Sequence, residues 1–243
     1  MKFIEKGSKP NSYIIHLFGL RIRFRNTFAY KGNKIIVIDK NGNGKKVKKI
    51  KGLKVNFLGS NSTVKIYYPC PKFQNAVITC RNNANVTIGG SKYYIKYCLL
   101  DAAASNSTIT IGKNCFIRGG YFVTADKDGL NISIGDECLI ANSVKITATD
   151  FHTVYDLDSK IPINPPEDII IGNHCWICQD VTIAKGSILP DDTIVAAKAY
   201  VTGTFEKTNT IIGGVPAKII RENTSWSATG YDKYIESLPE FSA

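Results

Sequence analysis

His152 is a histidine whose side chain could transfer a proton. His152 lies in the stretch KITATDFHTVYDLDSK, residues 145–160, and imidazole is the side chain that ordinarily titrates closest to neutral pH. A carboxylate that accepts from one ring nitrogen holds such a base in a single tautomer, and Asp150 is the nearest candidate in sequence. The chemistry open to these two side chains is general acid–base catalysis, with His152 as base and Asp150 as its partner. The plainer alternative is a polar side chain on a solvated loop.

Apolar residues return every six positions on both sides of that stretch. No α-helix keeps one face at a strict step of six, whereas short strands joined by tight turns do. A fixed period marks a repeat protein whose units pack against their neighbours, so the sequence predicts a β-solenoid. Its predicted inward anchors are Ile111, Ile117, Val123, Ile134, Ile140, Ile146, Ile171, Ile177, Ile183, Leu189, Val195 and Val201.

The positions two residues before these anchors should share the interior, because side chains alternate along a strand. Most of them are small or apolar, which suits a narrow interior. They are Cys115, Tyr121, Cys138, Val144, Cys175, Val181, Ser187, Thr193 and Ala199. Three related units, IGKNCFI, IGDECLI and IGNHCWI, place a glycine directly after the anchor, where the backbone must turn. We interpret these units as equivalent sides of successive coils.

The six-residue period breaks twice. The first break, after Val123, is short, but Ile146 and Ile171 are 25 positions apart. A packed coil has no room for so many residues, so the longer break predicts a loop at about 147–170 that projects from the solenoid. His152 lies at the start of this loop, where the next anchor would otherwise stand.

Trp176 is the second residue with an unusual setting. It stands one position before the anchor Ile177, so strand alternation directs its side chain away from the interior. An outward tryptophan on the face of a solenoid is either covered by a neighbouring subunit or walls a ligand groove.

The pattern [LIV]-[GA]-x-x-[small]-x resembles the hexapeptide-repeat acyltransferases, whose fold is a left-handed parallel β-helix with three hexads per coil. The resemblance covers about residues 85–222 and is strongest over 146–222. It implies an all-β chain with a hexapeptide-repeat acyltransferase β-helix at 85–222. We expect an N-terminal cap with irregular β-coils at 1–84 and a C-terminal tail or short helix at 223–243.

The order D-x-H, loop, C-W-I and then GGVPAKIIRE is similar to the polysaccharide and sugar O-acetyltransferase branch of that family. The resemblance implies transfer of an acetyl group from acetyl-CoA to a sugar hydroxyl of a bacterial capsule or lipopolysaccharide, sialylated glycans included. It also implies that His152 is the general base. A sugar hydroxyl is a poor nucleophile at neutral pH, so a base must take its proton as it attacks the thioester.

The same resemblance implies that acetyl-CoA runs along the outside of the C-terminal coils and that the protein is a cyclic homotrimer. The implied cofactor-binding residues are Trp176, Ala197, Thr202, Gly213, Gly214, Lys218 and Arg221. Among these, the glycine pair allows close backbone approach and the two cations suit nucleotide phosphates. Three residues, Cys178, Lys198 and Pro190, replace glycines usual in the family and indicate a tighter or shifted path.

Composition limits the alternatives. The chain has 243 residues, a net charge of +11, seven cysteines and no apolar stretch near the roughly 20 residues that span a bilayer. Its start lacks the pattern of a secretory signal, and an odd number of scattered cysteines fits reduced thiols, so we expect a cytoplasmic protein without an integral membrane segment. The lysine-rich run at 40–54 carries no interleaved aromatics, so we do not expect nucleic acid as a partner.

Several features of the sequence are compatible with other functions. N-acetylation of an amino sugar nucleotide is the nearest competing enzyme activity, and a non-catalytic β-solenoid binding protein is the alternative without chemistry. The spacing C-x-x-C at 175–178 suggests redox or zinc chemistry in other settings, but the repeat phase points the two thiols in opposite directions. Three histidines, His16, His152 and His174, give little support for a metal site, so no metal is expected.

Overall fold

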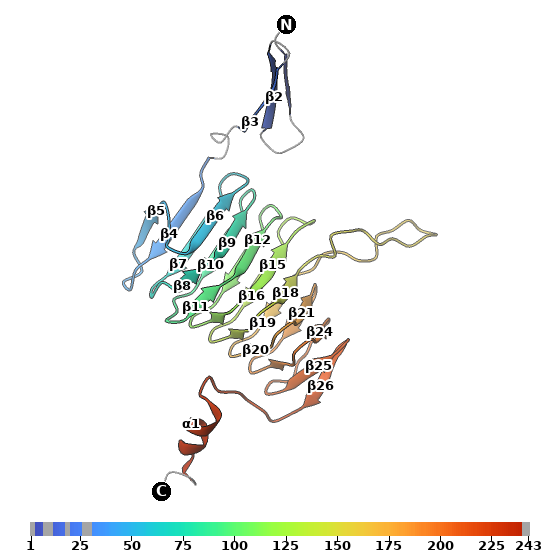
Figure 1. The fold of residues 1–243 in the computed structure, drawn as a ribbon. Coiled ribbons are helices and arrows are strands. Elements are labelled where there is room, and N and C mark those ends of the chain that lie inside the picture. Colours follow the sequence, from blue (N-terminus) through green and yellow to red (C-terminus); the bar gives the residue numbers. More distant parts are fainter. Residues whose placement is uncertain (1–2, 7–11, 18–19, 26–30, 240–243) are drawn as a thin grey trace.

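Parallel strands wound into a three-sided prism make up most of the protein (Figure 1). The computed structural model describes residues 3–6, 12–17, 20–25 and 31–239. From β7 to β24 the chain visits sheet I, then sheet II, then sheet III in every coil. The solenoid predicted from the six-residue period is therefore confirmed.

The three sheets hold 23 of the strands numbered in Figure 1. In spatial order, sheet I contains β5 (Gly44–Val47), β4 (Lys34–Ile38), β7 (Thr63–Tyr67), β10 (Asn85–Ile88), β13 (Thr108–Ile111), β16 (Asn131–Ile134), β19 (Ile169–Ile171) and β22 (Ile188–Leu189). Sheet II contains β8 (Lys72–Gln74), β11 (Tyr94–Lys96), β14 (Phe116–Ile117), β17 (Leu139–Ile140), β20 (Trp176–Ile177), β23 (Ile194–Val195), β25 (Ile211–Gly214) and β26 (Ala217–Arg221). Sheet III contains β6 (Leu53–Phe57), β9 (Ala76–Cys80), β12 (Cys98–Ala102), β15 (Gly120–Thr124), β18 (Val144–Thr147), β21 (Thr182–Ala184) and β24 (Tyr200–Val201).

Aliphatic side chains of equivalent strands stack inside the prism. Ile134 pairs with Ile171 across sheet I, Ile140 with Ile177 across sheet II and Ile146 with Ile183 across sheet III. All twelve predicted anchors are at most 1% exposed. Burial of these side chains stabilises the fold by roughly 1.5–3 kcal/mol each, so the repeat itself supplies the hydrophobic core.

One predicted anchor is out of register by one residue. Phe122, not Val123, pairs with Ile146 and fills the interior, while Tyr121 faces outward and lies half-buried opposite Lys145. The cause is the length of the corner between sheets II and III, which takes five steps from Ile117 to Phe122, as it does from Ile95 to Leu100 in the coil before, but six from Ile140 to Ile146 in the coil after. A Cβ on Gly120 would lie only 2.6 Å from the carbonyl oxygen of Val144, so glycine permits the close approach of the longer corner that follows.

The solenoid continues on both sides of the predicted boundary at residue 84. In sheet I, β7 pairs in parallel with β4 before it and with β10 after it. Residues 34–84, within the segment 1–84 expected to hold irregular coils, thus belong to the same three sheets. An antiparallel hairpin ends one sheet at each end of the solenoid, β4–β5 in sheet I and β25–β26 in sheet II.

Two short regions lie outside the solenoid. Near the N-terminus, β1 (Phe3–Lys6), β2 (Ser12–Leu17) and β3 (Leu20–Arg25) form an antiparallel sheet. After β26, residues 222–230 run back to a helix of six residues, α1 (Tyr231–Glu236), within the tail expected at 223–243. Residues 1–2, 7–11, 18–19, 26–30 and 240–243 of these predicted segments lie outside the described residues.

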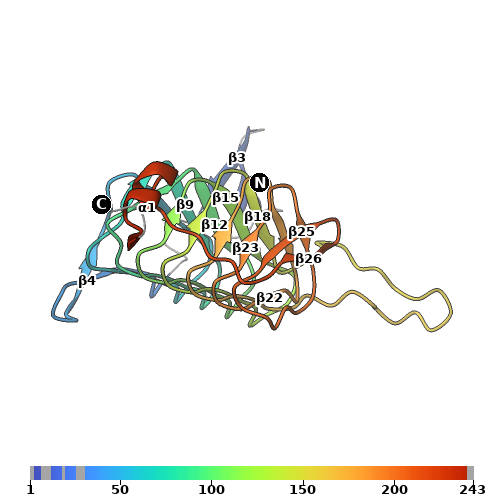
Figure 2. The same cartoon turned by 90° about the horizontal axis from the view of Figure 1, so that it is seen from below.

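The loop predicted at about 147–170 extends far from the prism in both views (Figure 1 and Figure 2). It follows β18, which ends at Thr147, and returns at β19, which begins at Ile169. Among the described residues, no helix has the length and apolar character needed to cross a membrane.

Candidate active site

The inserted loop folds as a narrow hairpin with His152 near its base. Ile163 N donates to Val154 O at 2.9 Å, and Asp156 N donates to Ile161 O at 3.0 Å, so the two limbs are joined along their length. His152 precedes the first of these bonds, and its side chain is exposed. An exposed imidazole on a paired backbone can meet a substrate without rearrangement of the core.

Asn164 holds the base of the loop together. Its Nδ2 donates to the backbone oxygen of His152 and to Oδ2 of Asp150, each at 2.9 Å. Its Oδ1 accepts from Val154 N at 2.7 Å. One amide therefore ties the limb that carries His152 to the returning limb, which fixes the histidine backbone relative to the prism.

Asp150 is engaged by a lysine rather than by the histidine. Lys185 Nζ lies 2.7 Å from Asp150 Oδ2 and also donates to Pro165 O at 3.1 Å. The hydrogen bond from Lys185, supported by Asn164, holds the pKa of the Asp150 carboxyl below its ordinary value. The described contacts of Asp150 include no bond to the His152 ring, so the role predicted for it as tautomer partner remains a prediction.

A cavity of about 200 Å³ opens beside His152. The buried hydroxyl of Thr149 forms its floor, donating to Asp126 and accepting from Phe151 N at 2.9 Å. Its lining residues are Asp126, Thr149, Asp150, Phe151, His152, Thr153, Pro162, Asn164, Pro165 and Pro166. Carboxylates, a hydroxyl and an imidazole around one cavity can orient a polyhydroxylated substrate and accept a proton from it.

Trp176 faces outward, as predicted, and its side chain is 36% exposed. It lies on β20 in sheet II, whereas the loop leaves at the corner between sheets III and I. The cavity beside His152 is not lined by Trp176. Within one chain the two residues predicted to serve one site therefore lie on different sides of the prism.

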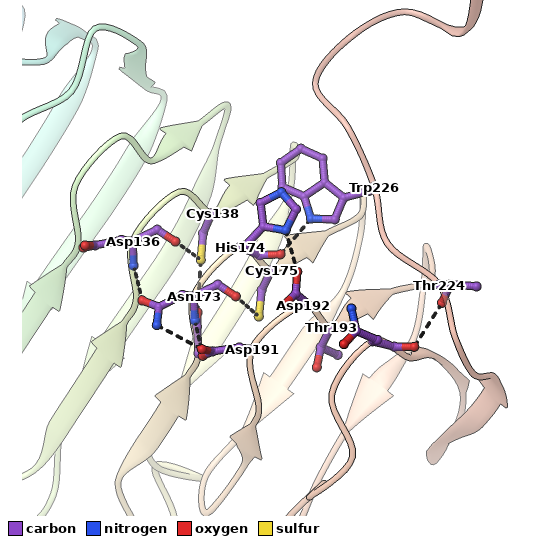
Figure 3. A network of polar contacts seen from close by, with 12 residues as sticks. Asp136, Cys138, Asn173, His174, Cys175, Asp191, Asp192, Thr193, Thr224 and Trp226 are labelled. Carbon is purple, nitrogen blue, oxygen red and sulfur yellow. Dashed lines mark hydrogen bonds and ion pairs between the residues drawn. The ribbon is translucent and has the colours of Figure 1, made fainter. Parts of the chain in front are cut away.

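A second imidazole, that of His174, lies between Asp192 and the indole of Trp226 (Figure 3). His174 Nδ1 is 2.7 Å from Asp192 Oδ1, and its ring stacks on Trp226 with centroids 4.6 Å apart and an interplanar angle of 11°. Trp226 Nε1 donates to His174 O at 2.7 Å, and the two indole rings are 6.0 Å apart. The C-terminal segment is thus pinned across this corner of the prism.

The other predicted cofactor residues are spread over the last coils. Ala197 is exposed in the turn between β23 and β24, whereas Thr202 is exposed in the turn after β24, at the next corner. In the terminal hairpin, Gly213 lies opposite Lys218, and Gly214 has the positive φ of 103° that favours glycine.

The two cations predicted to bind phosphate, Lys218 and Arg221, are free of other charged contacts in the described part of the chain. Both side chains are exposed. In contrast, nearby Lys207 is paired with Glu222.

Thiols and metal ligands do not form a site in the described residues. Cys175 is buried and Cys178 is half-buried on the opposite side of the strand, as the repeat phase predicts. No group of three or more His, Cys, Asp or Glu side chains in this part of the chain is arranged to hold a metal ion.

Several known proteins are similar to this chain in sequence and fold, although no protein-family profile matches the chain. Over 183 residues it is 33% identical to an uncharacterised 24.8 kDa protein from the cps region of Klebsiella pneumoniae, covering 74% of this chain and 78% of that protein. Over 128 residues it is 32% identical to the polysialic acid O-acetyltransferase of Neisseria meningitidis, covering 53% of this chain and 49% of that enzyme. The crystal structure of the polySia-specific acetyltransferase NeuO superposes with a TM-score of 0.69 at 27% identity, covering 87% and 92% of the two chains. The chain belongs to the hexapeptide-repeat acetyltransferases.

These similarities confirm both the family and the left-handed parallel β-helix predicted for the chain. The chain spans about half the length of the first curated relatives it matches. The roles of the predicted site residues in this hexapeptide-repeat protein remain predictions.

Sequence patterns did not indicate three contacts around the two sites. Asn164 and Lys185 position the loop, and Trp226 covers the corner beside Trp176. The available signal for Trp226 was its type, since it is the second of two tryptophans and stands in an otherwise polar tail. A large aromatic residue in such a segment indicates a docking contact.

Proposed function

We propose that this chain is an acetyl-CoA-dependent O-acetyltransferase that acetylates a sugar hydroxyl of a bacterial surface glycan. The observation that carries the proposal is His152, exposed at the tethered base of the inserted loop and beside a polar cavity. Support comes from the relatives named as polysialic acid O-acetyltransferases and from the NeuO structure. A solenoid that only bound ligands would not need this imidazole.

His152 acts as the general base. It takes the proton of a sugar hydroxyl as the oxygen attacks the carbonyl carbon of the acetyl thioester. A backbone N–H stabilises the oxyanion that forms, the C–S bond breaks and the thiolate of coenzyme A leaves. The proton held by the imidazole then passes to that thiolate, so the products are an acetyl ester and free coenzyme A.

The donor is proposed to lie along the last coils. Lys218 and Arg221 can bind the nucleotide phosphates, since phosphate oxygens form strong charge-assisted bonds with such cations. Gly213 and Gly214 allow the donor to approach the backbone, Ala197 and Thr202 line its path, and Trp176 walls the groove near the thioester.

The acceptor is proposed to be a capsule or lipopolysaccharide glycan. The net charge of +11 would steer an anionic glycan toward the enzyme at low ionic strength. We place the reaction in the cytoplasm, because the described cysteines are all free thiols and reduced thiols persist in that compartment.

Assembly into a cyclic homotrimer completes the proposed site. Val154, Leu157 and Ile163 of the loop are more than half exposed, and such apolar side chains are normally covered by a partner. In the trimer the loop of one subunit reaches sheet II of the next, which brings His152 toward the Trp176 of its neighbour.

Coenzyme A release tests the proposal. The protein is incubated with acetyl-CoA and a panel of bacterial surface glycans, and free thiol and acetylated product are followed by a thiol reagent and mass spectrometry. We expect thiol release that depends on glycan, and a product whose acetyl group is removed by mild alkali, as an ester is and an amide is not. An alkali-stable product would favour N-acetylation, and no release with any glycan would overturn the proposal.

A further inference from the structure

A groove along sheet II is lined by side chains suited to a sugar ring. Its volume is about 350 Å³, within the usual range for ligand sites. It passes Phe116 and Leu139 on the outer face of the sheet and ends under the C-terminal segment at His174 and Trp226. Trp226 also lies 6.0 Å from Trp176, so the groove adjoins the site proposed for acetyl transfer.

Aromatic rings stand at both ends of the groove. Tyr93 and Phe116 are stacked at one end, 6.0 Å apart, and His174 and Trp226 are stacked at the other. Flat aromatic faces pack against the apolar C–H faces of a pyranose ring and keep its hydroxyls at the rim. Neighbouring coils are about 4.8 Å apart, so the groove spans several coils and has room for more than one sugar residue.

Polar side chains stand between the rings. Asn114, Glu137 and His174 occupy the same corner in three successive coils, each with a positive φ between 51° and 60°. The carboxylate of Asp192 accepts a hydrogen bond from His174 Nδ1. In contrast, the exposed side chains of Asn114 and Glu137 have no hydrogen-bond partner among the described residues. An amide and a carboxylate left free beside aromatic rings can bond to sugar hydroxyls.

The charges of the groove favour a neutral sugar. Lys92 is the cation of its lining, and its Nζ already lies 5.2 Å from the centre of the Tyr93 ring. Glu137 supplies an anion in the middle of the lining, and Asp192 supplies another behind His174. A carboxylated sugar seated beside Glu137 would face like charge, whereas a neutral hexose would donate hydroxyl hydrogens to it.

We propose that this groove binds a neutral pyranose residue of the acceptor glycan, at a subsite distinct from the sugar that is acetylated. The proposal rests on the proposed function, since it assigns the acceptor of that reaction to glycans longer than one sugar. Acceptors that fill both places would bind more tightly than a monosaccharide, because the second contact is made without a further loss of freedom.

Direct binding without acetyl-CoA tests the subsite. The probe is an immobilised panel of neutral and sialylated oligosaccharides, with hits confirmed by calorimetry. We expect neutral oligosaccharides to bind the parent and Trp226→Ala to weaken them about tenfold. Tyr231→Ala is the matched control, because Tyr231 is an exposed aromatic of the same segment outside the groove. Glu137→Gln, a surface change that leaves the core intact, should strengthen binding of sialylated oligosaccharides.

The outcomes separate this subsite from the catalytic proposal. Equal binding by the parent and Trp226→Ala, binding of sialylated oligosaccharides alone, or no binding by any probe would each overturn the subsite. Absence of thiol release despite binding that depends on Trp226 would overturn acetyl transfer and leave the subsite standing.

Discussion

His152 and His174 lie in different electrostatic surroundings. His174 has a carboxylate at Nδ1 and an indole against its face, so both its tautomer and its orientation are constrained. His152 is exposed, and the neighbouring Asp150 is committed to Lys185. We therefore expect the His152 ring to acquire its final orientation when substrate or a second subunit reaches it.

Replacement of His152 by alanine should abolish most turnover. Loss of a general base lowers the rate by roughly 10²–10⁴-fold, and an exposed side chain leaves folding unaffected. The measurement is coenzyme A release under saturating donor, with a thermal melt to confirm the fold. Asp158→Asn, another exposed position of the same loop, is the control. Turnover near the parent rate in the His152 variant would exclude it as the base.

The ion pair at the base of the loop gives a prediction about pH. Lys185 lowers the pKa of Asp150, so the pair stabilises the folded loop above the ordinary Asp pKa, and that contribution is lost as pH falls through the lowered value. Lys185→Met should raise the Asp150 pKa toward its ordinary value, as measured by NMR titration of the side-chain carboxyl. Lys207→Met, which removes a distant ion pair, should leave it unchanged. An Asp150 pKa that does not rise in Lys185→Met would show that the pair is broken in solution.

At the scale of elements, the parts that repeat could be predicted from sequence and the parts that occur once could not. Each coil buries aliphatic residues that recur at a fixed spacing along the sequence. The solenoid, its interior and the position of the inserted loop therefore follow from this spacing alone. The error at Phe122 arose because the corner after Ile117 is one residue shorter than the equivalent corner after Ile140, and the residue types around it do not show the difference. Trp226 meets His174 across 52 positions that share no period, so no local pattern indicates the contact.

The terminal hairpin β25–β26 is the element proposed to hold the donor phosphates. Replacing Lys218 and Arg221 together by alanine should weaken acetyl-CoA binding by about one to two orders of magnitude, since each charged hydrogen bond contributes about 1.5–3 kcal/mol and the exposed setting reduces this. The measurement is calorimetric titration with coenzyme A. Acetyl-pantetheine, which lacks the nucleotide phosphates, should bind both proteins equally. Unchanged affinity for coenzyme A would place the donor elsewhere.

At the scale of the whole molecule, the arrangement of the two outward features argues for assembly. A single prism has convex faces, and a convex face does not enclose a thioester. The loop projects from one corner and exposes Val154, Leu157 and Ile163. Trp176 lies on sheet II, away from that corner. Closed cyclic symmetry lets each loop meet a neighbour and forms identical sites at every interface.

Mixing subunits tests whether the site is shared. His152→Ala and Trp176→Ala each remove one side of the proposed groove, so either variant alone should be nearly inactive. In mixed trimers some interfaces combine an intact loop histidine with an intact tryptophan, and we expect coenzyme A release to recover at those interfaces. Sedimentation should show a trimer throughout, and mixing two batches of His152→Ala serves as the control. An active monomer would contradict the shared site, whereas a trimer without recovery would mean that both residues act within one subunit, where their separation on the prism would require the loop to fold back across the corner.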